Sequence, residues 1–275
     1  MNDKVIKVYK KGGETPLDCI DNLKKERPEL GLLPITYAGR LDPLAEGLLL
    51  LLIGEECKKK DEYINLSKEY EVEVLFGFAT DTYDVMGKVM TEEATSGKLF
   101  EKYSVLLTEV FGKLGQTVPN SFPNFASKIQ DIIPQFIGKI KQSYPPYSSR
   151  PVKGKPLFMW AREGKLDEIE IPAHNVFIEN IEIAGNREIL GKELLEEIKE
   201  KLANVKGDFR QEEIIDIWEN ELRNKEDEKY PVIKLRISCG SGVYVRVIAQ
   251  EIGEKLGLPS LALKIVRTKV GEYYI

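Results

Sequence analysis

The chain has 275 residues, of which 42% are hydrophobic and 31% are charged, and its net charge is −5. This is the composition of an ordinary globular protein that is long enough for a sizeable core. The longest apolar run, residues 48–53, is too short to span a bilayer, and the N-terminus lacks the apolar core of a signal peptide. We therefore expect a cytoplasmic protein.

The residue types that bind metals are sparse and scattered. His174 is the single histidine, which excludes multi-histidine metal sites, and Cys19, Cys57 and Cys239 have no metal-ligand or redox spacing. We therefore expect neither a metal nor a cofactor. Because histidine supplies most proton transfer near neutral pH, any catalysis here must depend on Asp, Glu, Tyr, Lys or Cys. We expect His174 to have a structural role at the start of a strand.

The first half of the chain predicts one helix and one strand. Thr15 is a helix cap, followed by Pro16 at the first helical position and Asp18 in the first turn, with Leu17, Ile20 and Leu23 on the apolar face. Residues 70–76 alternate between apolar and polar side chains, which is typical of a half-buried strand.

The second half predicts more strands than helices. We expect strands at 174–184, 232–238, 243–247 and 267–275, and a helix at 247–256 that Gly257 closes. Because strands and helices do not alternate as in parallel sheets, the pattern favours a single α+β domain over 1–275, with a mainly antiparallel mixed sheet flanked by helices and loops.

An acidic stretch, residues 186–230, carries 14 acidic and 9 basic side chains, so the rest of the chain is neutral. Apolar residues at helical spacing predict helices at 187–204 and 211–222, followed by a solvated linker at 223–230. We interpret 186–230 as an acidic helical insert that either braces the domain or binds an unknown partner.

A basic stretch has the opposite character. Residues 138–165 hold seven basic side chains and one acidic one, interleaved with Tyr144, Tyr147, Phe158 and Trp160. Because cations attract phosphates and aromatic rings stack on unpaired bases, this stretch suggests a surface that faces RNA. The alternative is a solvated loop whose aromatic rings lie in the core.

Asp42 lies in GRLDPLAEG, just before the apolar run, and has two interpretations. It could cap a short helix that has Pro43 at its first position. A carboxylate at such a position is also held ionised and can act as a nucleophile. The two interpretations are compatible.

Five stretches in order resemble one protein family. YAGRLDPLAEGLLLLLIG, residues 37–54, resembles the signature of the TruB family of tRNA pseudouridine-55 synthases, in which Gly-x-Leu-Asp-Pro-x-Ala-x-Gly holds the catalytic aspartate. The other four are KEYEVEVLFGFATDTYDVMGKV (68–89), PPYSSRPVKGKPLFMWAREG (145–164), CGSGVYVRVIAQEIGEKLG (239–257) and IVRTKVGEYYI (265–275).

The resemblance implies the pseudouridine synthase catalytic fold, base flipping and cofactor-free isomerisation of uridine 55 in the T-loop of tRNA. By matching positions, Asp42 is the catalytic aspartate, Tyr70 stacks on the flipped uracil and assists proton transfer, and Arg246 pairs with Asp42. If this pair lies in a largely dry pocket, we expect both carboxylate oxygens within hydrogen-bonding distance of the guanidinium. The implied pocket residues are Tyr244, Tyr37 and Ile265, and the implied RNA-binding residues are Lys10, Arg150, Lys153, Lys155 and Arg162.

The sequence also departs from the family pattern. Tyr37 stands where the family usually has histidine, Pro151 where lysine is usual, and Lys11 where proline is usual. Ile265 and Val266 replace a leucine and an arginine of the closing strand. The C-terminal RNA-binding PUA domain of many members is expected to be absent, and the 186–230 insert has no family counterpart that we can place.

Two other functions fit parts of this pattern. An RNA-binding protein or tRNA-folding chaperone could keep the fold with weak or no catalysis, although the set Asp42, Tyr70 and Arg246 argues against it. A small-molecule isomerase or hydrolase could use Asp42, although the basic and aromatic stretch argues against that.

Overall fold

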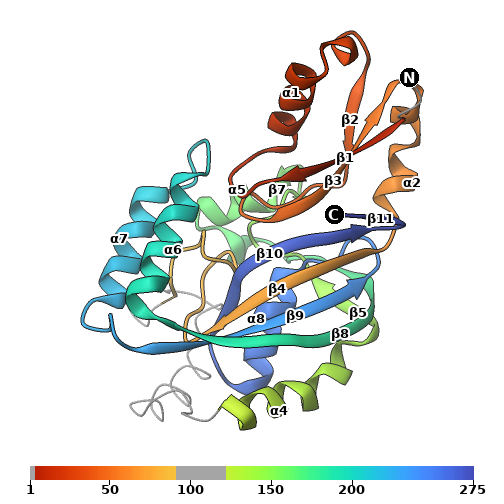
Figure 1. Ribbon diagram of the computed structural model, residues 1–275. Helices are drawn as coiled ribbons and strands as arrows, with labels where there is room; N and C mark the ends of the chain where they lie inside the picture. Colours follow the sequence, from red (N-terminus) through yellow and green to blue (C-terminus); the bar gives the residue numbers. More distant parts are fainter. Residues whose placement is uncertain (1–3, 91–121) are drawn as a thin grey trace.

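A nine-stranded mixed sheet dominates the computed structural model, which describes residues 4–90 and 122–275 (Figure 1). The strands are β1 (Val5–Lys10), β2 (Ile35–Ala38), β3 (Glu46–Ile53), β4 (Lys68–Phe76), β5 (Gly138–Ser143), β6 (Pro151–Val152), β7 (Lys155–Pro156), β8 (Ala173–Leu190), β9 (Lys229–Cys239), β10 (Ser260–Val270) and β11 (Tyr273–Tyr274). The α-helices are α1 (Pro16–Glu26), α2 (Lys60–Ile64), α4 (Phe122–Ile132), α5 (Leu157–Arg162), α6 (Gly191–Ala203), α7 (Gln211–Leu222) and α8 (Val245–Leu256). Short 3-10 helices cover Pro28–Leu30, Gly54–Lys59, Ile133–Phe136 and Leu166–Glu168.

The main path of the sheet runs β1-β3-β10-β4-β9-β8-β5, with β2 paired to β3 and β11 to β10. Among the described strand pairs, only β3 with β10 is parallel. The predicted α+β class with a mainly antiparallel mixed sheet is therefore confirmed. Strand β10 lies between β3 and β4, so it joins the N-terminal strands to the rest of the sheet.

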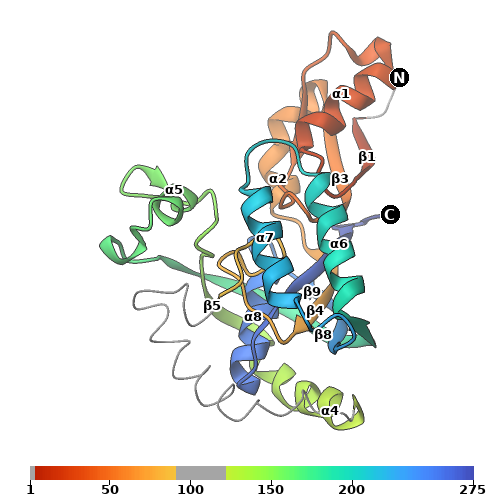
Figure 2. The same cartoon turned by 90° about the vertical axis from the view of Figure 1, so that its left-hand side faces the viewer.

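Each face of the sheet has its own hydrophobic core. On β4, Tyr70, Val72, Val74 and Phe76 contribute to a cluster that includes α8 and α4 residues, whereas Leu75 contributes to a cluster that includes α6 and α7 residues. The alternation predicted for residues 70–76 is confirmed because one side of the strand packs on each layer. Figure 2 shows the α6–α7 pair in front of the sheet when the molecule is turned.

The acidic stretch forms two helices with buried inner faces. Leu194, Ile198 and Leu202 of α6 pack with Ile214, Trp218 and Leu222 of α7 in the second core. The predicted start of the first helix at residue 187 is wrong, because β8 continues to Leu190 and buries Ile189 against Tyr230 of β9.

Two further local predictions need correction. Residues 243–247 do not continue a strand: β9 ends at Cys239, a turn with Gly242 at φ +85° follows, and α8 begins at Val245. The helix does end at Gly257, which is left-handed as predicted. In α1 the Thr15 and Asp18 capping box is present, but Leu17 is 63% exposed because Cys19, Ile20 and Leu23 form the buried face.

Gly47 offers a test of how closely β10 approaches β3. Its φ is +109°, and a Cβ there would lie 2.3 Å from the carbonyl oxygen of Arg267 on β10. We expect Gly47→Ala to lower the free energy of unfolding by about 3 kcal/mol, measured by urea denaturation, because backbone strain and a backbone clash add. Gly54→Ala is the control, since its φ is also positive but its Cβ would meet no atom within 4 Å; its loss should be about 1 kcal/mol. Equal losses would contradict the constraint from β10.

Candidate active site

Asp42 lies in the loop between β2 and β3. The loop makes a turn in which the Ala45 N–H donates to the Asp42 carbonyl at 3.1 Å, and β3 begins directly afterwards. The helix-cap interpretation of Asp42 is therefore wrong, because no helix follows it. A buried lysine binds the backbone carbonyls of this loop.

The lysine is Lys10, the last residue of β1. Its Nζ donates to the carbonyls of Lys11 (3.2 Å), Asp42 (3.3 Å), Pro43 (3.1 Å) and Ala45 (2.7 Å). Lys10 is fully buried, and desolvation lowers its pKa to about 8. The expectation that Lys10 contacts RNA is therefore wrong: its ammonium group is used to fasten the Asp42 loop.

Arg246, in the first turn of α8, meets Asp42 from the other side of the site. Its Nε donates to Oδ2 of Asp42 at 2.9 Å; the Arg246 side chain is 4% exposed and that of Asp42 is 35% exposed. Nη1 donates to the Thr82 carbonyl at 2.6 Å and Nη2 to the Tyr147 carbonyl at 2.8 Å. The expected contact through both carboxylate oxygens is wrong, because two carbonyls occupy the outer nitrogens.

Tyr70, on β4, lies near enough to Asp42 to be affected by its charge. It is buried in the same core cluster as Leu41, the residue before Asp42, and Ile265 of β10. Burial raises the pKa of Tyr70, and the negative charge of Asp42 adds to the increase, while the guanidinium of Arg267 opposes it. The phenol is therefore neutral at physiological pH.

Tyr244 also borders the pair. It precedes α8, and its ring centroid lies 5.8 Å from the guanidinium carbon of Arg246. The buried Gln142 side chain fixes its backbone by accepting from its N–H at 2.8 Å and donating to its carbonyl at 3.2 Å. Burial raises the pKa of Tyr244, with a further contribution from Asp42.

Tyr37 is less closely associated with the pair. It lies on β2, where its hydroxyl accepts from Nε of Arg40 at 3.3 Å and Lys60 lies 4.9 Å from its ring centroid. It packs against the core under α1. Its contacts are thus with the N-terminal strands and helices rather than with Arg246.

Asp84 also lies near the Asp42–Arg246 pair, although it is not among the site residues named from the sequence. It is buried, and its Oδ1 accepts from Oγ1 of Thr82 at 2.6 Å and from the Met86 N–H at 3.0 Å. Burial raises its pKa to about 6, an increase that the charge of Arg246 limits. The run Thr-Asp-Thr-Tyr-Asp could have drawn attention to it, but its spacing gives no sign that Arg246 lies beside it.

The basic side chains of residues 138–165 differ in their exposure and in whether a carboxylate neutralises their charge. Lys153 is exposed at the turn between β6 and β7, where its Nζ donates to the Glu168 carbonyl at 3.1 Å with no carboxylate partner among the described residues, and Arg150 is exposed with its guanidinium 5.0 Å from the Tyr144 ring. Lys155 instead pairs with Glu163 at 2.7 Å and lies 3.7 Å from the Trp160 ring centroid. Arg162 donates to the Asp208 carbonyl at 2.6 Å.

The arrangement can support carboxylate chemistry. Asp42 is partly exposed, so its carboxylate can reach a substrate, while the buried Arg246 fixes its position. Within residues 4–90 and 122–275, no group of three His, Cys, Asp or Glu side chains is placed to hold a metal ion. No helix in that part of the chain is long and apolar enough to cross a membrane.

The raised pKa of Asp84 predicts a pH dependence of stability. Between pH 3.8 and about 6, folded Asp84 keeps a proton that the unfolded chain has released, so the free energy of unfolding falls as the pH rises through this range. This residue should contribute a decrease of about 3 kcal/mol. Urea unfolding at several pH values should therefore show Asp84→Asn gaining stability relative to the unsubstituted protein up to about pH 6, and no further gain above it. If the free energy of unfolding changed with pH in the same way for both proteins, Asp84 would titrate in the folded protein as it does in the unfolded chain.

Comparisons with known proteins agree with the sequence motifs. A family model described as TruB family pseudouridylate synthase (N terminal domain) matches residues 27–124 and 120–194, more than half of the chain. A relative called tRNA pseudouridine synthase B, from Caldanaerobacter subterraneus subsp. tengcongensis, is 28% identical over 99% of this chain and 70% of its own length. A protein of the same name from Clostridium tetani is 27% identical over 98% of this chain and 68% of its own length.

The fold has a counterpart among solved structures. A chain in the crystal structure of a Cbf5-Nop10-Gar1 complex aligns with 98% of this chain at a TM-score of 0.52 and 16% sequence identity. The aligned part is 50% of that chain, so this protein spans about half its length. At this identity the likeness concerns the fold alone, whereas the family match rests on the sequence. The chain therefore belongs to the TruB family of pseudouridylate synthases.

Proposed function

We propose that this chain isomerises uridine to pseudouridine in tRNA, at position 55 of the T-loop, as a single cytoplasmic catalytic domain over residues 1–275 with 186–230 as an insert. The observation that carries the proposal is the Asp42 carboxylate, held at 2.9 Å by the buried Arg246 beside a buried neutral Tyr70. The names of the two tRNA pseudouridine synthase B relatives support the choice of tRNA as substrate.

The reaction balances without any other reactant. The bond from ribose C1′ to uracil N1 breaks, a bond from C1′ to C5 forms, the C5 proton is lost and N1 gains a proton. Asp42 is the group that meets the ribose and uracil during the bond exchange, because its carboxylate is partly exposed and is held by Arg246. Arg246 keeps that carboxylate in place.

Tyr70 acts chiefly as a platform for the uracil. The target base must leave the RNA stack to reach a buried site, and stacking on an aromatic ring offsets about 1–3 kcal/mol of that cost. Because burial raises the pKa of Tyr70, its phenol is a poor proton acceptor at neutral pH. We therefore favour the stacking role over that of a general base.

RNA binding in this proposal depends on the exposed cations of the basic stretch. Arg150 and Lys153 are exposed beside Tyr144 and the β6–β7 turn. Lys155 already has a carboxylate partner, Glu163, so its charge is less available to phosphates, whereas Lys153 and Arg162 donate to the uncharged carbonyls of Glu168 and Asp208. We assign the T-arm of tRNA to this surface.

The first test removes the charge of Asp42. Asp42→Asn should lower pseudouridine formation in tRNA transcripts by roughly a thousandfold or more, as removal of a catalytic carboxylate does. Pseudouridine would be mapped chemically at each position, with a transcript lacking uridine 55 to test the site. Affinity for tRNA should stay nearly constant because phosphate contacts dominate it.

Asp61→Asn, on the exposed surface of α2, is the matched control and should keep full turnover. Turnover by Asp42→Asn close to that of the control would remove Asp42 from the mechanism. Binding without any pseudouridine in the unsubstituted protein would instead favour an RNA-binding protein or chaperone of the same fold. Absence of both would favour a small-molecule substrate.

The second test compares two neighbouring lysines. Lys153→Met should reduce the slope of log affinity against log salt by about 0.9, the value for one phosphate contact. Lys155→Met should change the slope much less, because Glu163 already neutralises this lysine at 2.7 Å. Salt titrations of tRNA binding measure both slopes. An unchanged slope for Lys153→Met would show that the β6–β7 turn faces away from the RNA.

A further inference from the structure

The α6–α7 unit reaches the active site through one short loop. We call residues 204–210 the connector, because they join the end of α6 to the start of α7. Figure 2 shows the connector at the end of the helix pair that lies nearest to α1. Lys206 of the connector pairs with Asp18 of α1 at 2.9 Å, which agrees with this view.

Arg210, at the end of the connector, turns toward the site. Its Nη1 donates to Oδ2 of Asp81 at 3.0 Å, its guanidinium carbon lies 4.7 Å from the Tyr147 ring centroid, and its side chain is 18% exposed. Its backbone is left-handed at φ +65°, and its N–H donates to Oδ1 of Asp208 at 3.1 Å. The side chain is therefore held in one direction by both its own loop and its partners.

Both partners of Arg210 adjoin the groups that hold Arg246. The Tyr147 carbonyl accepts Nη2 of Arg246, and Thr82, which follows Asp81, accepts Nη1. Asp81 and Tyr147 come from separate segments, one after β4 and one after β5. Arg210 thus joins the two segments whose carbonyls orient the guanidinium of Arg246.

The connector also contacts the Asp42 side of the site. Asn204 packs so closely on Gly13 that a Cβ there would lie 2.1 Å from the Asn204 carbonyl oxygen. The Gly13 N–H donates to the carbonyl of Pro43 at 2.9 Å, next to Asp42. The connector therefore contacts segments that adjoin both residues of the Asp42–Arg246 pair.

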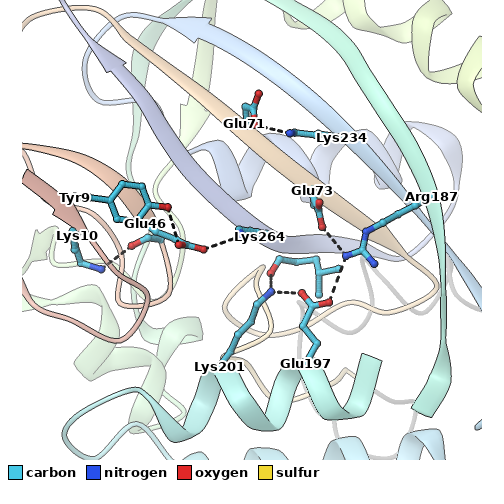
Figure 3. Close-up of polar contacts among 12 residues, drawn as sticks. Tyr9, Lys10, Glu46, Glu71, Glu73, Arg187, Glu197, Lys201, Lys234 and Lys264 are labelled. Atoms are coloured by element: carbon cyan, nitrogen blue, oxygen red, sulfur yellow. Dashed lines mark hydrogen bonds and ion pairs between the residues drawn. The ribbon is translucent and has the colours of Figure 1, made fainter. Parts of the chain in front are cut away.

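The helices behind the connector are firmly attached. The segment 79–90, which carries Asp81 and Thr82, shares a hydrophobic core with α6 and α7 through Val85, Met86 and Val89. Figure 3 shows Arg187 of β8 between Glu73 and Glu197, and Lys201 beside Glu197. Lys201 also donates to the Leu263 carbonyl of β10 at 2.6 Å. These contacts fix α6, from which the connector begins, to the sheet.

We propose that Arg210 is a positioning residue of the active site, through which the α6–α7 insert keeps the carbonyls of Thr82 and Tyr147 aligned on Arg246. The inference rests on the proposed function and chooses bracing over partner binding as the role of the insert. Arg210 does not touch the reacting atoms. It acts on Asp42 through Arg246, so its loss leaves the catalytic groups present but misaligned.

The experiment uses the full chain with Arg210→Met, and Lys199→Met as the matched control. Lys199 pairs with Glu219 inside the insert, so the control removes one cation from the same helices without touching the site. Single-turnover pseudouridine formation at saturating tRNA should fall about tenfold to a hundredfold in Arg210→Met, as small misplacements of catalytic groups do. Affinity for tRNA should change by less than about threefold, since no phosphate contact is lost.

A second measurement needs no RNA. Hydrogen exchange of the backbone amides in residues 79–90 and 144–150 should become faster in Arg210→Met and stay unchanged in Lys199→Met. Because Arg210 also begins α7, Asp81→Asn removes the same contact from the other side and should give the same two results. Arg210→Lys should restore part of the rate, since it keeps the charge for Asp81 but loses the planar group over Tyr147.

The outcomes separate the two proposals. Faster exchange in both segments supports the inference even if the unsubstituted protein forms no pseudouridine, a result that would contradict only the proposed function. Unchanged exchange in both segments overturns the inference whatever the activity. The inference is also overturned if the slower pseudouridine formation of Arg210→Met disappears at saturating tRNA and its log affinity depends less on log salt. That result would make Arg210 a phosphate contact.

Discussion

The buried guanidinium of Arg246 is the interaction on which the rest of the site depends. A charged group inside a protein is destabilising unless its hydrogen bonds are satisfied and its charge is compensated. Arg246 meets this requirement with one carboxylate and two carbonyls, from Asp42, Thr82 and Tyr147. Each acceptor comes from a different loop, so satisfying the arginine fixes the relative positions of three loops at once.

The two-layer architecture explains how these loops can be held so closely. The core that includes α8 residues supports Arg246 and Tyr70, while the core that includes α6 and α7 residues supports the 79–90 segment. The sheet between them is shared, so the site lies where both layers contribute. Lys10 adds a third constraint from the N-terminal strands by binding four carbonyls around the Asp42 loop.

Local signals in the sequence predicted local structure well. The capping box of Thr15 and Asp18 and the alternation of residues 70–76 act over a few residues, and both are present. Errors arose where tertiary contacts override local preference. The residues assigned to a helix at 187–190 are in β8 because they pair with β9. The strand expected at 243–247 is absent because β9 ends before a glycine turn and α8 begins at Val245.

The site was only partly accessible to sequence reasoning. The motifs singled out Asp42, Tyr70 and Arg246, which lie near one another in the structure. Matching positions cannot tell a buried lysine from an exposed one, so Lys10 stood among the expected RNA-binding residues. Asp84 was missed because its environment is created by burial next to Arg246, a contact between segments far apart in the sequence. The role of the insert was also undetermined, since it depends on where the connector ends in space.

The central place of β10 has a consequence for how the protein is made. This strand lies between β3 and β4, and it is synthesised after almost all the other strands. While the chain emerges from the ribosome, the N-terminal strands and β4 lack the strand that lies between them, and their edges stay open to other contacts. Asp42 and Arg246 therefore reach their final environment only after β10 has been synthesised and has entered the gap between the N-terminal strands and β4.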